Sequence, residues 1–351
     1  MTEGEPKARF LSVFDKKAVN PAPVWLMRQA GRYLPEYQAT RKKAGSFWTM
    51  CMTPDLAEEV TLQPIRRFDL DAAILFSDIL VIPHALGQGV RFEDGIGPVV
   101  DPLPPLAELD LNEDHWAEKL DPVYEALARV RGALACDKAM IGFAGAPWTL
   151  AAYMIEGHGT KDQASARLFA YRNPVLFSSL LDILSHAVAQ HLIAQLKAGA
   201  DVVQIFDSWA GGLPERSFAE WVIAPTRHVV TEVRAAFPKA RIIGFPRQAT
   251  QVGLERYVAQ TGVDGVSIDT GTSMEWAASA LGKAAILQGN LDPMALVTGG
   301  AVLDRAVDDI LHATVNTPFI FNLGHGVVPQ TPPEHVAHVV SRIRAAEGIA
   351  H

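Results

Sequence analysis

Short apolar runs, rich in β-branched residues, recur along this 351-residue chain and alternate with longer helical patterns. Each run is continuously apolar, which is typical of parallel strands that are buried on both faces of a sheet. Eight strand–helix units in succession predict an α/β fold, a single (β/α)8 barrel of the TIM type that spans residues 1–351 as one domain. Because no glycine-rich dinucleotide fingerprint follows a run, a doubly wound sheet is disfavoured. The predicted strands are Val24–Met27, Ala72–Phe76, Met140–Ala144, Asp201–Phe206, Arg241–Phe245, Gly265–Ile268, Ala285–Gln288 and Pro318–Leu323.

Helix signals lie between these runs. Asn173 supplies an N-cap, Pro174 supplies the first helical position, and Gly199 is placed to end the same helix. An insertion at Gly89–Pro102 is rich in Gly and Pro and predicts a hairpin or flap. Further helices are predicted at Pro214–Phe237, Asp292–Gly299, Ala301–Ala313 and Pro333–Ala346.

The acidic balance of the chain and its few cysteines limit what it binds. A net charge of −8 leaves no global basic field, so no nucleic-acid partner is expected. The two cysteines, Cys51 and Cys136, form neither a CxxC motif nor a ligand-spaced pair with histidine, which argues against a disulfide framework and a zinc site. The N-terminus carries no apolar signal region, and Asp71, Asp78 and Pro83 interrupt the most apolar windows well before about 20 residues. We therefore expect a cytoplasmic protein without membrane insertion.

In a barrel of this type the active site lies at the carboxyl ends of the strands, so the polar residues just after each run are the candidates. These residues are rich in acids, bases and hydroxyls, but their spacing matches no metal-ligand motif, and no metal is expected. They are Arg28, Ser77-Asp78, Asp207-Ser208, Arg247, Asp269, Asn290 and Gly324-His325.

Two arginines, Arg28 and Arg32, stand four residues apart directly after the first run. Arginine is always charged, and its fork of donors fits a carboxylate or phosphate in bidentate fashion. Gly31 lets the backbone turn without a Cβ penalty, and Arg41 begins a further basic cluster. The segment is either a clamp for planar anions or an ordinary solvated basic loop.

Two other residues have a structural and a functional interpretation. Asp78 places one carboxylate inside an otherwise apolar sequence, where ionisation is costly unless several donors satisfy it. It either caps the following helix or awaits the N–H groups of a ligand. His325 lies between Gly324 and Gly326, where it is either a loop residue or free to meet a ligand.

Taken together, five motifs resemble the uroporphyrinogen decarboxylase family. The resemblance runs in order over nearly the whole chain, and the first motif is highly specific. It implies a usually homodimeric (β/α)8 barrel that uses no cofactor and removes four carboxyl groups from uroporphyrinogen III. The product is coproporphyrinogen III, in haem biosynthesis. The motifs are RQAGRYLPEY from Arg28, FSDIL from Phe76, GAPWT from Gly145, FDS from Phe206 and NLGHG from Asn322.

The resemblance also implies roles for individual residues. Asp78 would bind the pyrrole N–H groups at the centre of the macrocycle and act in catalysis with Arg28, Tyr153 and His325. Position 208 is Ser where many bacterial relatives have Thr, which keeps the hydroxyl. The full set that would bind substrate or shape its surroundings is Arg28, Gln29, Ala30, Gly31, Arg32, Arg41, Phe47, Asp78, Tyr153, Phe206, Ser208 and His325.

These residue types suit that chemistry. An acidic protein needs a dense local set of arginines to bind an ion with eight carboxylates. Decarboxylation needs an electron sink, and a pyrrole protonated on a ring carbon supplies one without a cofactor. A fixed anion such as Asp78 stabilises the cation that then forms. The proton donor is left open among a water or hydronium positioned by Arg28, Tyr153 and His325.

Two rival functions have different requirements. A cobalamin-linked methyltransferase with the same barrel needs zinc held by a His-x-Cys pair and a further Cys, and neither Cys51 nor Cys136 has that setting. A non-catalytic tetrapyrrole-binding protein would use the same arginines, so product formation is the observation that separates it from an enzyme.

Overall fold

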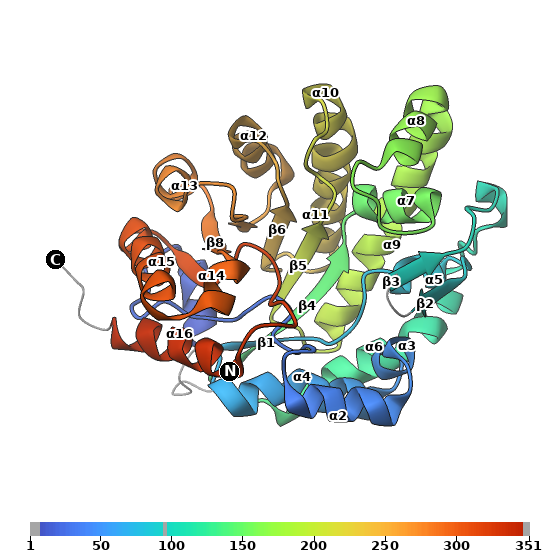
Figure 1. The fold of residues 1–351 in the computed structure, drawn as a ribbon. Helices are drawn as coiled ribbons and strands as arrows, with labels where there is room; N and C mark the ends of the chain where they lie inside the picture. The colour runs from blue at the N-terminus through green and yellow to red at the C-terminus, as the bar shows by residue number, and fades with distance from the viewer. Residues whose placement is uncertain (1–7, 94–96, 347–351) are drawn as a thin grey trace.

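The computed structural model describes residues 8–93 and 97–346. Within these ranges, seven parallel strands form one curled sheet in the order β1-β4-β5-β6-β7-β8-β9, with helices on its outer face (Figure 1). A separate antiparallel pair, β2 and β3, lies at the predicted hairpin. The strands are β1 (Ala72–Ile74), β2 (Val90–Glu93), β3 (Gly97–Val100), β4 (Ala139–Gly145), β5 (Val202–Asp207), β6 (Ile242–Pro246), β7 (Gly265–Ser267), β8 (Ile286–Leu291) and β9 (Phe319–Leu323).

The helices follow the strands in the predicted alternation. The predicted helix at Pro214–Phe237 is divided, because a π-helical turn, η3, separates α10 from α11. The helices are α1 (Arg9–Ser12), η1 (Val13–Asp15), α2 (Pro35–Ala44), α3 (Phe47–Cys51), α4 (Pro54–Phe68), α5 (Val81–Ala85), η2 (Leu106–Glu108), α6 (Glu113–Ala133), α7 (Pro147–Glu156), α8 (Ala164–Arg172), α9 (Pro174–Lys197), α10 (Glu215–Phe218), η3 (Ala219–Ile223), α11 (Ala224–Ala236), α12 (Gln251–Thr261), α13 (Met274–Leu281), α14 (Pro293–Thr298), α15 (Gly300–Thr314) and α16 (Pro333–Ala345).

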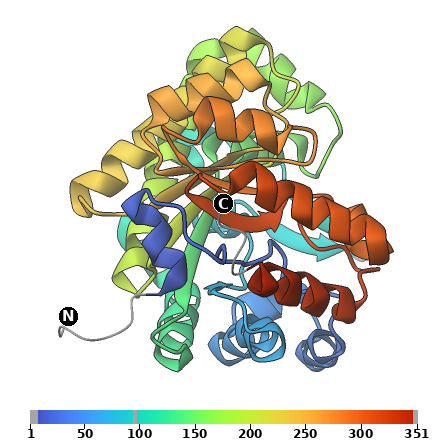
Figure 2. The same cartoon turned by 90° about the vertical axis from the view of Figure 1, so that its left-hand side faces the viewer.

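The outer helices contact one another in succession around the sheet. α4 packs on α6, α6 on α9, α9 on α11, α11 on α12 and α12 on α13. α13 then packs on α15 and α15 on α16, and α16 packs back on α4. Figure 2 shows α16, in dark red, near the blue helices of the N-terminal part. The helix layer therefore surrounds the sheet.

The prediction of eight strands is wrong for the first run, Val24–Met27. Only Val24 forms a bridge, a parallel one to Phe321 of β9. On the other side, the backbone N–H of Asp71, just before β1, donates to the carbonyl of Val24 at 2.9 Å. Two further N–H groups of the segment donate to side chains instead of a strand, Val24 to Asp71 Oδ2 at 2.7 Å and Met27 to Asn322 Oδ1 at 2.9 Å. The segment lies between β9 and β1 as a single bridge, where Trp25 N–H donates to the Phe321 carbonyl at 3.3 Å and Phe321 N–H donates to the Pro23 carbonyl at 2.8 Å.

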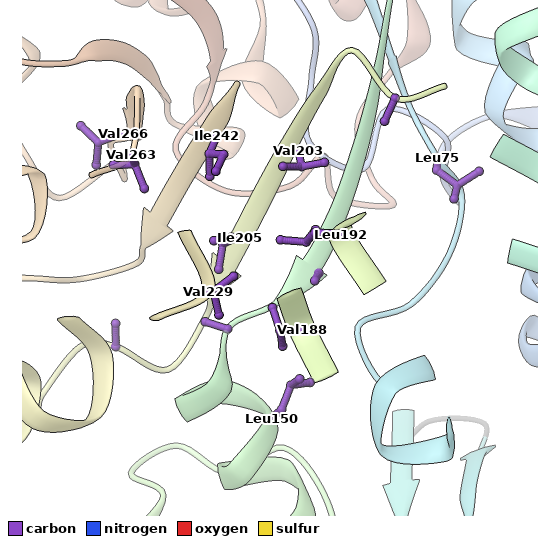
Figure 3. Packing of buried hydrophobic residues seen from close by; sticks show 14 of the residues in the cluster. Leu75, Leu150, Val188, Leu192, Val203, Ile205, Val229, Ile242, Val263 and Val266 are labelled. Atoms are coloured by element: carbon purple, nitrogen blue, oxygen red, sulfur yellow. The ribbon is translucent and has the colours of Figure 1, made fainter. Parts of the chain in front are cut away.

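Buried side chains form one cluster inside the curled sheet and one outside it. Phe10 of α1, Trp25, Ile141 and Ile243 belong to the inner cluster. The outer cluster fills the space between the sheet and the helices. Figure 3 shows Val203 and Ile205 of β5 beside Val188 and Leu192 of α9 in this layer. Because both faces of the strands are buried, their sequences are continuously apolar.

Within residues 8–93 and 97–346, one helix, α9, is long and apolar enough to cross a membrane by length and composition, which the interrupted apolar windows of the sequence did not predict. In the structure 61% of its most apolar window is buried. α9 packs against β4, β5, α7 and α11, which accounts for its apolar surface as part of the core.

Candidate active site

The predicted site residues come from different elements at the carboxyl edge of the sheet. Ser208 follows β5, His325 lies two residues after β9, and Tyr153 lies in α7 after β4. Arg28 follows the segment that lies between β9 and β1, and Asp78 lies in the turn between β1 and α5. The charge of Arg28 acts on the pKa of Asp78, Tyr153 and His325. The fold therefore brings Arg28, Asp78, Tyr153 and His325 close together.

Arg28 is held in an unusual backbone conformation by its neighbours. Its φ is +62°, in the left-handed region that non-glycine residues seldom adopt. The aliphatic part of its side chain lies directly over Gly326, where a Cβ atom would come 2.3 Å from Arg28 Cδ. A Cβ at Gly31 would likewise approach the carbonyl oxygen of Arg28 to 3.0 Å. Glycine at these two positions therefore leaves room for the path of the Arg28 backbone and side chain.

Gln29 has an internal role in this loop. Its side chain is fully buried, with Oε1 accepting from the N–H of Leu26 at 3.1 Å and Nε2 donating to the carbonyl of Ala72 at 3.1 Å. Its carbonyl accepts a hydrogen bond from Tyr33 at 2.8 Å. The side chain of Gln29 thus connects the Arg28 loop to β1 by hydrogen bonds, and its amide group points away from solvent. Ala30 follows in the same turn and packs against the core.

Asp78 does not cap the following helix. α5 begins at Val81 with Leu80 at its N-cap position and no capping side chain. Asp78 Oδ1 instead accepts from the N–H of Leu80 at 2.9 Å, a bond that spans two residues. Within residues 8–93 and 97–346, no donor meets Oδ2. One carboxylate oxygen of Asp78 therefore has no partner in the described part of the chain.

The surroundings of Asp78 make its charge costly. Burial raises its pKa to about 6, against the opposing effects of the Leu80 N–H and the charge of Arg28. Because that value lies below 7, the ionised form of the carboxylate predominates at pH 7. Asp78 is partly exposed, and an ionised group with an unpaired oxygen at such a position is suited to accept N–H donors from a ligand.

His325 and Tyr153 are both neutral near pH 7. Burial lowers the pKa of His325 to about 4, and the charges of Arg28 and Arg247 act in the same direction. Its Nδ1 accepts from the N–H of Gly326 at 2.6 Å, so the proton lies on Nε2, which is a donor. Burial raises the pKa of Tyr153, as does the charge of Asp78. Both side chains can donate a hydrogen bond, but His325 is uncharged and is therefore a poor proton donor.

The remaining predicted residues lie around this group. Arg32 is exposed, and Arg41 lies in the last turn of α2. Burial raises the pKa of Tyr37 to about 12, and the charges of Arg41 and Arg32 both oppose that shift. Phe47 of α3 contacts Phe76 and Phe92, with ring centres 5.5 and 4.6 Å apart. The contact with Phe92 joins α3 to the β2–β3 hairpin.

Phe206 is 8% exposed and belongs to the cluster inside the sheet. Its ring meets Phe143 and Phe245 edge-on, with centres 5.7 and 6.2 Å apart. It lies at the end of β5 with only a small exposed area, so its main contacts are within the protein. The neighbouring Ser208 accepts a hydrogen bond from Arg247 Nη1 through its carbonyl at 3.4 Å.

Arg247 is one of the polar residues after the strands to which the sequence alone assigned no role. It follows β6 and is partly buried, and its charge acts on His325. The signal in the sequence was its position directly after an apolar run. The described part of the chain holds no group of three or more His, Cys, Asp or Glu side chains that could bind a metal ion.

Comparison with known proteins decides the family. The family model described as uroporphyrinogen decarboxylase (URO-D) matches residues 5–346. The chain belongs to the uroporphyrinogen decarboxylase family. Among the curated members, the uroporphyrinogen decarboxylase of Brucella anthropi is 53% identical over 347 residues, covering 97% of this chain and 99% of that protein. The Chelativorans sp. uroporphyrinogen decarboxylase is 54% identical over 338 residues, covering 96% and 98%.

Solved structures of other proteins share the fold of this family member. A methyltransferase from Methanosarcina mazei superposes with a TM-score of 0.77 at 20% identity, over 96% of this chain and 97% of that one. A B12-independent methionine synthase from Shewanella sp. gives a TM-score of 0.55 at 12% identity, over 94% and 97%. At these identities the likeness is one of fold.

Proposed function

We propose that the chain is a carboxy-lyase that removes the four acetate carboxyl groups of uroporphyrinogen III and forms coproporphyrinogen III, in haem biosynthesis. Family membership over nearly the whole chain supports the activity. The observation that carries the mechanism is the Asp78 carboxylate, which has one oxygen without a partner in the described protein and lies within reach of the charge of Arg28. The methyltransferase alternative is not favoured, because the relatives at 52–54% identity are decarboxylases.

Asp78 fits the centre of the macrocycle. The four pyrrole N–H groups of a porphyrinogen point inward, and a carboxylate offers about four lone-pair sites to accept them. Arg28, Arg32 and Arg41 would then meet the peripheral carboxylates. Tyr153, Ser208 and the Nε2–H of neutral His325 would donate hydrogen bonds to the same groups. Phe47 and Phe206 would pack against the macrocycle.

The chemistry requires no resident cofactor. A proton adds to the pyrrole α-carbon next to the ring carbon that bears the acetate, and the ring becomes cationic. The bond to the carboxylate breaks, carbon dioxide leaves, and the electron pair neutralises the ring as an exocyclic methylene. A proton then adds to the methylene carbon and the ring carbon releases its proton, so one acetate becomes one methyl group for one net proton. Asp78 stabilises the cation, whose charge is larger in the transition state than in the substrate.

Three further features belong to this proposal. The Val24–Met27 segment bridges to β9 and is hydrogen-bonded beside β1, so we infer that it closes the sheet into a (β/α)8 barrel. The closed layer of helices agrees with one domain over residues 1–351. A homodimer in the cytoplasm is the expected state, by likeness to the family. The proton donor is either Tyr153 or a water held by Arg28, since neutral His325 is poorly suited to that step.

The direct test is anaerobic incubation of the protein with uroporphyrinogen III. We expect carbon dioxide release and coproporphyrinogen III as the final product. The oxidised planar porphyrin is the control, and it should not react, because conjugation removes the protonatable pyrrole and two of the four central N–H donors. Binding of uroporphyrinogen without any loss of carboxyl groups would assign the chain as a carrier. Equal turnover of the porphyrin would contradict the proposed electron sink.

Turnover is expected to survive exhaustive chelation and dialysis, because the residues that carry the mechanism include no metal ligands or cofactor anchor. The measurement is the initial rate before and after treatment, with the protein concentration matched. If zinc, cobalamin or pyridoxal phosphate restores activity to an inactive dialysed sample, the mechanism is wrong.

The rate should fall on the acid side of pH 6. Asp78 has its pKa raised to about 6, so its charge is present above that pH and is lost as the pH falls through it. We expect kcat/KM to decrease about tenfold for each pH unit below about pH 6, as for an enzyme with one essential base. His325, with a pKa of about 4, adds no step between pH 5 and 8. A flat profile over that range would mean that catalysis does not need the Asp78 charge.

A further inference from the structure

Arg247 has no acidic partner in the described residues, unlike several other partly buried arginines. Arg131, Arg234 and Arg342, which are 25%, 34% and 31% exposed, pair with Asp201, Asp264 and Asp308 at 2.9, 2.8 and 2.6 Å. In residues 8–93 and 97–346, no carboxylate lies within ion-pair distance of Arg247. Its single side-chain hydrogen bond in that part of the chain is the long one, 3.4 Å, to the Ser208 carbonyl.

Asp269 is the acid whose charge acts on Arg247, and both of its carboxylate oxygens already accept hydrogen bonds. Asp269 Oδ1 accepts from the N–H of Gly271 at 2.9 Å, and Asp269 Oδ2 accepts from the N–H of Gln248. Asp269 therefore holds the loops after β6 and β7 together through backbone donors. Its charge acts on Arg247 from a distance without forming a pair.

The surroundings of Arg247 are otherwise positive or neutral. Burial lowers its pKa, the charge of Arg28 lowers it further, and Asp269 opposes both effects. The guanidinium remains charged, because arginine is protonated at all relevant pH values. Two guanidiniums close together, with neutral His325 beside them, repel one another unless an anion lies between them. Among the described residues, neither Arg28 nor Arg247 forms an ion pair with a carboxylate.

We propose that Arg247 is a further substrate-binding residue, which holds one carboxylate of the macrocycle jointly with Arg28. The hydrogen bond to Ser208 directs the side chain along the carboxyl edge of the sheet from β6 toward β5, where the substrate-binding residues lie. This inference rests on the proposed function, which supplies a ligand with eight carboxylates. The bidentate fork of arginine matches that group.

The test compares Arg247→Gln, Arg247→Lys and a control, Arg305→Gln, in anaerobic steady-state kinetics with uroporphyrinogen. Arg305 is an exposed residue of α15, so its replacement removes the same charge far from the site. Loss of a charge-assisted hydrogen bond should raise KM about tenfold or more, with kcat within about threefold. Lys keeps the charge but loses the fork, so its KM should be intermediate. Arg305→Gln should behave as wild type.

A double-variant cycle tests whether Arg247 and Arg28 share one carboxylate. The combined Arg28→Gln and Arg247→Gln variant should lose less in kcat/KM than the product of the two single losses, because the same ligand group is removed only once. A combined loss equal to that product overturns the shared carboxylate. Urea unfolding of each variant serves as the readout of a purely structural role.

The outcomes separate the inference from the proposed function. If the wild type releases carbon dioxide and Arg247→Gln has an unchanged KM, Arg247 does not bind substrate. The same conclusion follows if kcat and the unfolding midpoint fall together while KM is constant, since Arg247 would then only support the Ser208 loop. If the wild type itself forms no product, the proposed function fails and the assignment of Arg247 fails with its ligand.

Discussion

Replacing Asp78 with asparagine is expected to reduce kcat by on the order of 10²–10³, the usual cost of removing one preorganised electrostatic group. Asparagine keeps the shape and one carbonyl acceptor, and that oxygen can still accept from the N–H of Leu80. The variant loses the negative charge and gains two donors that would face pyrrole N–H groups. The measurement is single-turnover release of carbon dioxide. Asp78→Glu should also be slower, because its longer arm moves the charge from the centre of the macrocycle.

The urea unfolding midpoint of Asp78→Asn separates a loss of catalysis from a loss of the fold. Because burial raises the pKa of Asp78 to about 6, the ionised form destabilises the folded state as the pH rises through that value. Asp78→Asn has no charge to bury, so at pH 8 its urea midpoint should equal or exceed that of wild type. A folded variant whose kcat stays within about threefold of wild type, far below the expected loss, would leave the mechanism without its anion.

Replacing Asp71 with alanine is expected to lower the free energy of unfolding by about 3–5 kcal/mol, the usual cost of removing one partner of a buried ion pair. Asp71 is 5% exposed, and its Oδ2 accepts from both the N–H of Val24 at 2.7 Å and Arg344 at 2.9 Å. Without it, Arg344 is left without its acid and the Val24 segment loses one anchor. Urea unfolding gives the change in stability.

Two comparisons sharpen this second prediction. Asp71→Asn keeps an acceptor for Val24 but not the charge for Arg344, so its loss should be smaller than that of alanine. Asp309 is an exposed residue of α15, and Asp309→Ala should change stability by no more than about 0.5 kcal/mol, as is usual for surface sites. Equal stability of the Asp71→Ala and Asp309→Ala variants would show that the anchor contributes nothing.

The sequence predicted seven of the strands well because burial on both faces leaves a continuous apolar run. It failed for Val24–Met27, because an apolar pattern reports burial and not the identity of hydrogen-bond partners. There the N–H groups of Val24 and Met27 donate to the side chains of Asp71 and Asn322, and Leu26 donates to Gln29. The partners of Val24 and Met27 lie 47 and 295 positions away in the sequence, so these pairings leave no local signal.

For the candidate site, the sequence predicted which residues lie together at the ends of the strands. The rule that polar residues after strands are functional located Arg28, Asp78 and His325, which the fold brings together. It could not show that the side chain of Gln29 turns inward, since that depends on two backbone partners on other segments. Nor could it show that Arg247 lacks an acidic partner, because ion pairs between elements are set by the packing of the whole chain.

The anchoring of the Arg28 segment has a consequence for biosynthesis. Met27 donates to Asn322, a residue 295 positions later in the chain. Val24 likewise bridges to β9, the last strand. A nascent chain that has not yet reached Asn322 can therefore fold much of its sheet but cannot fix Arg28 in place. Catalytic competence arises at the end of translation, and partly synthesised chains on the ribosome are expected to be inactive.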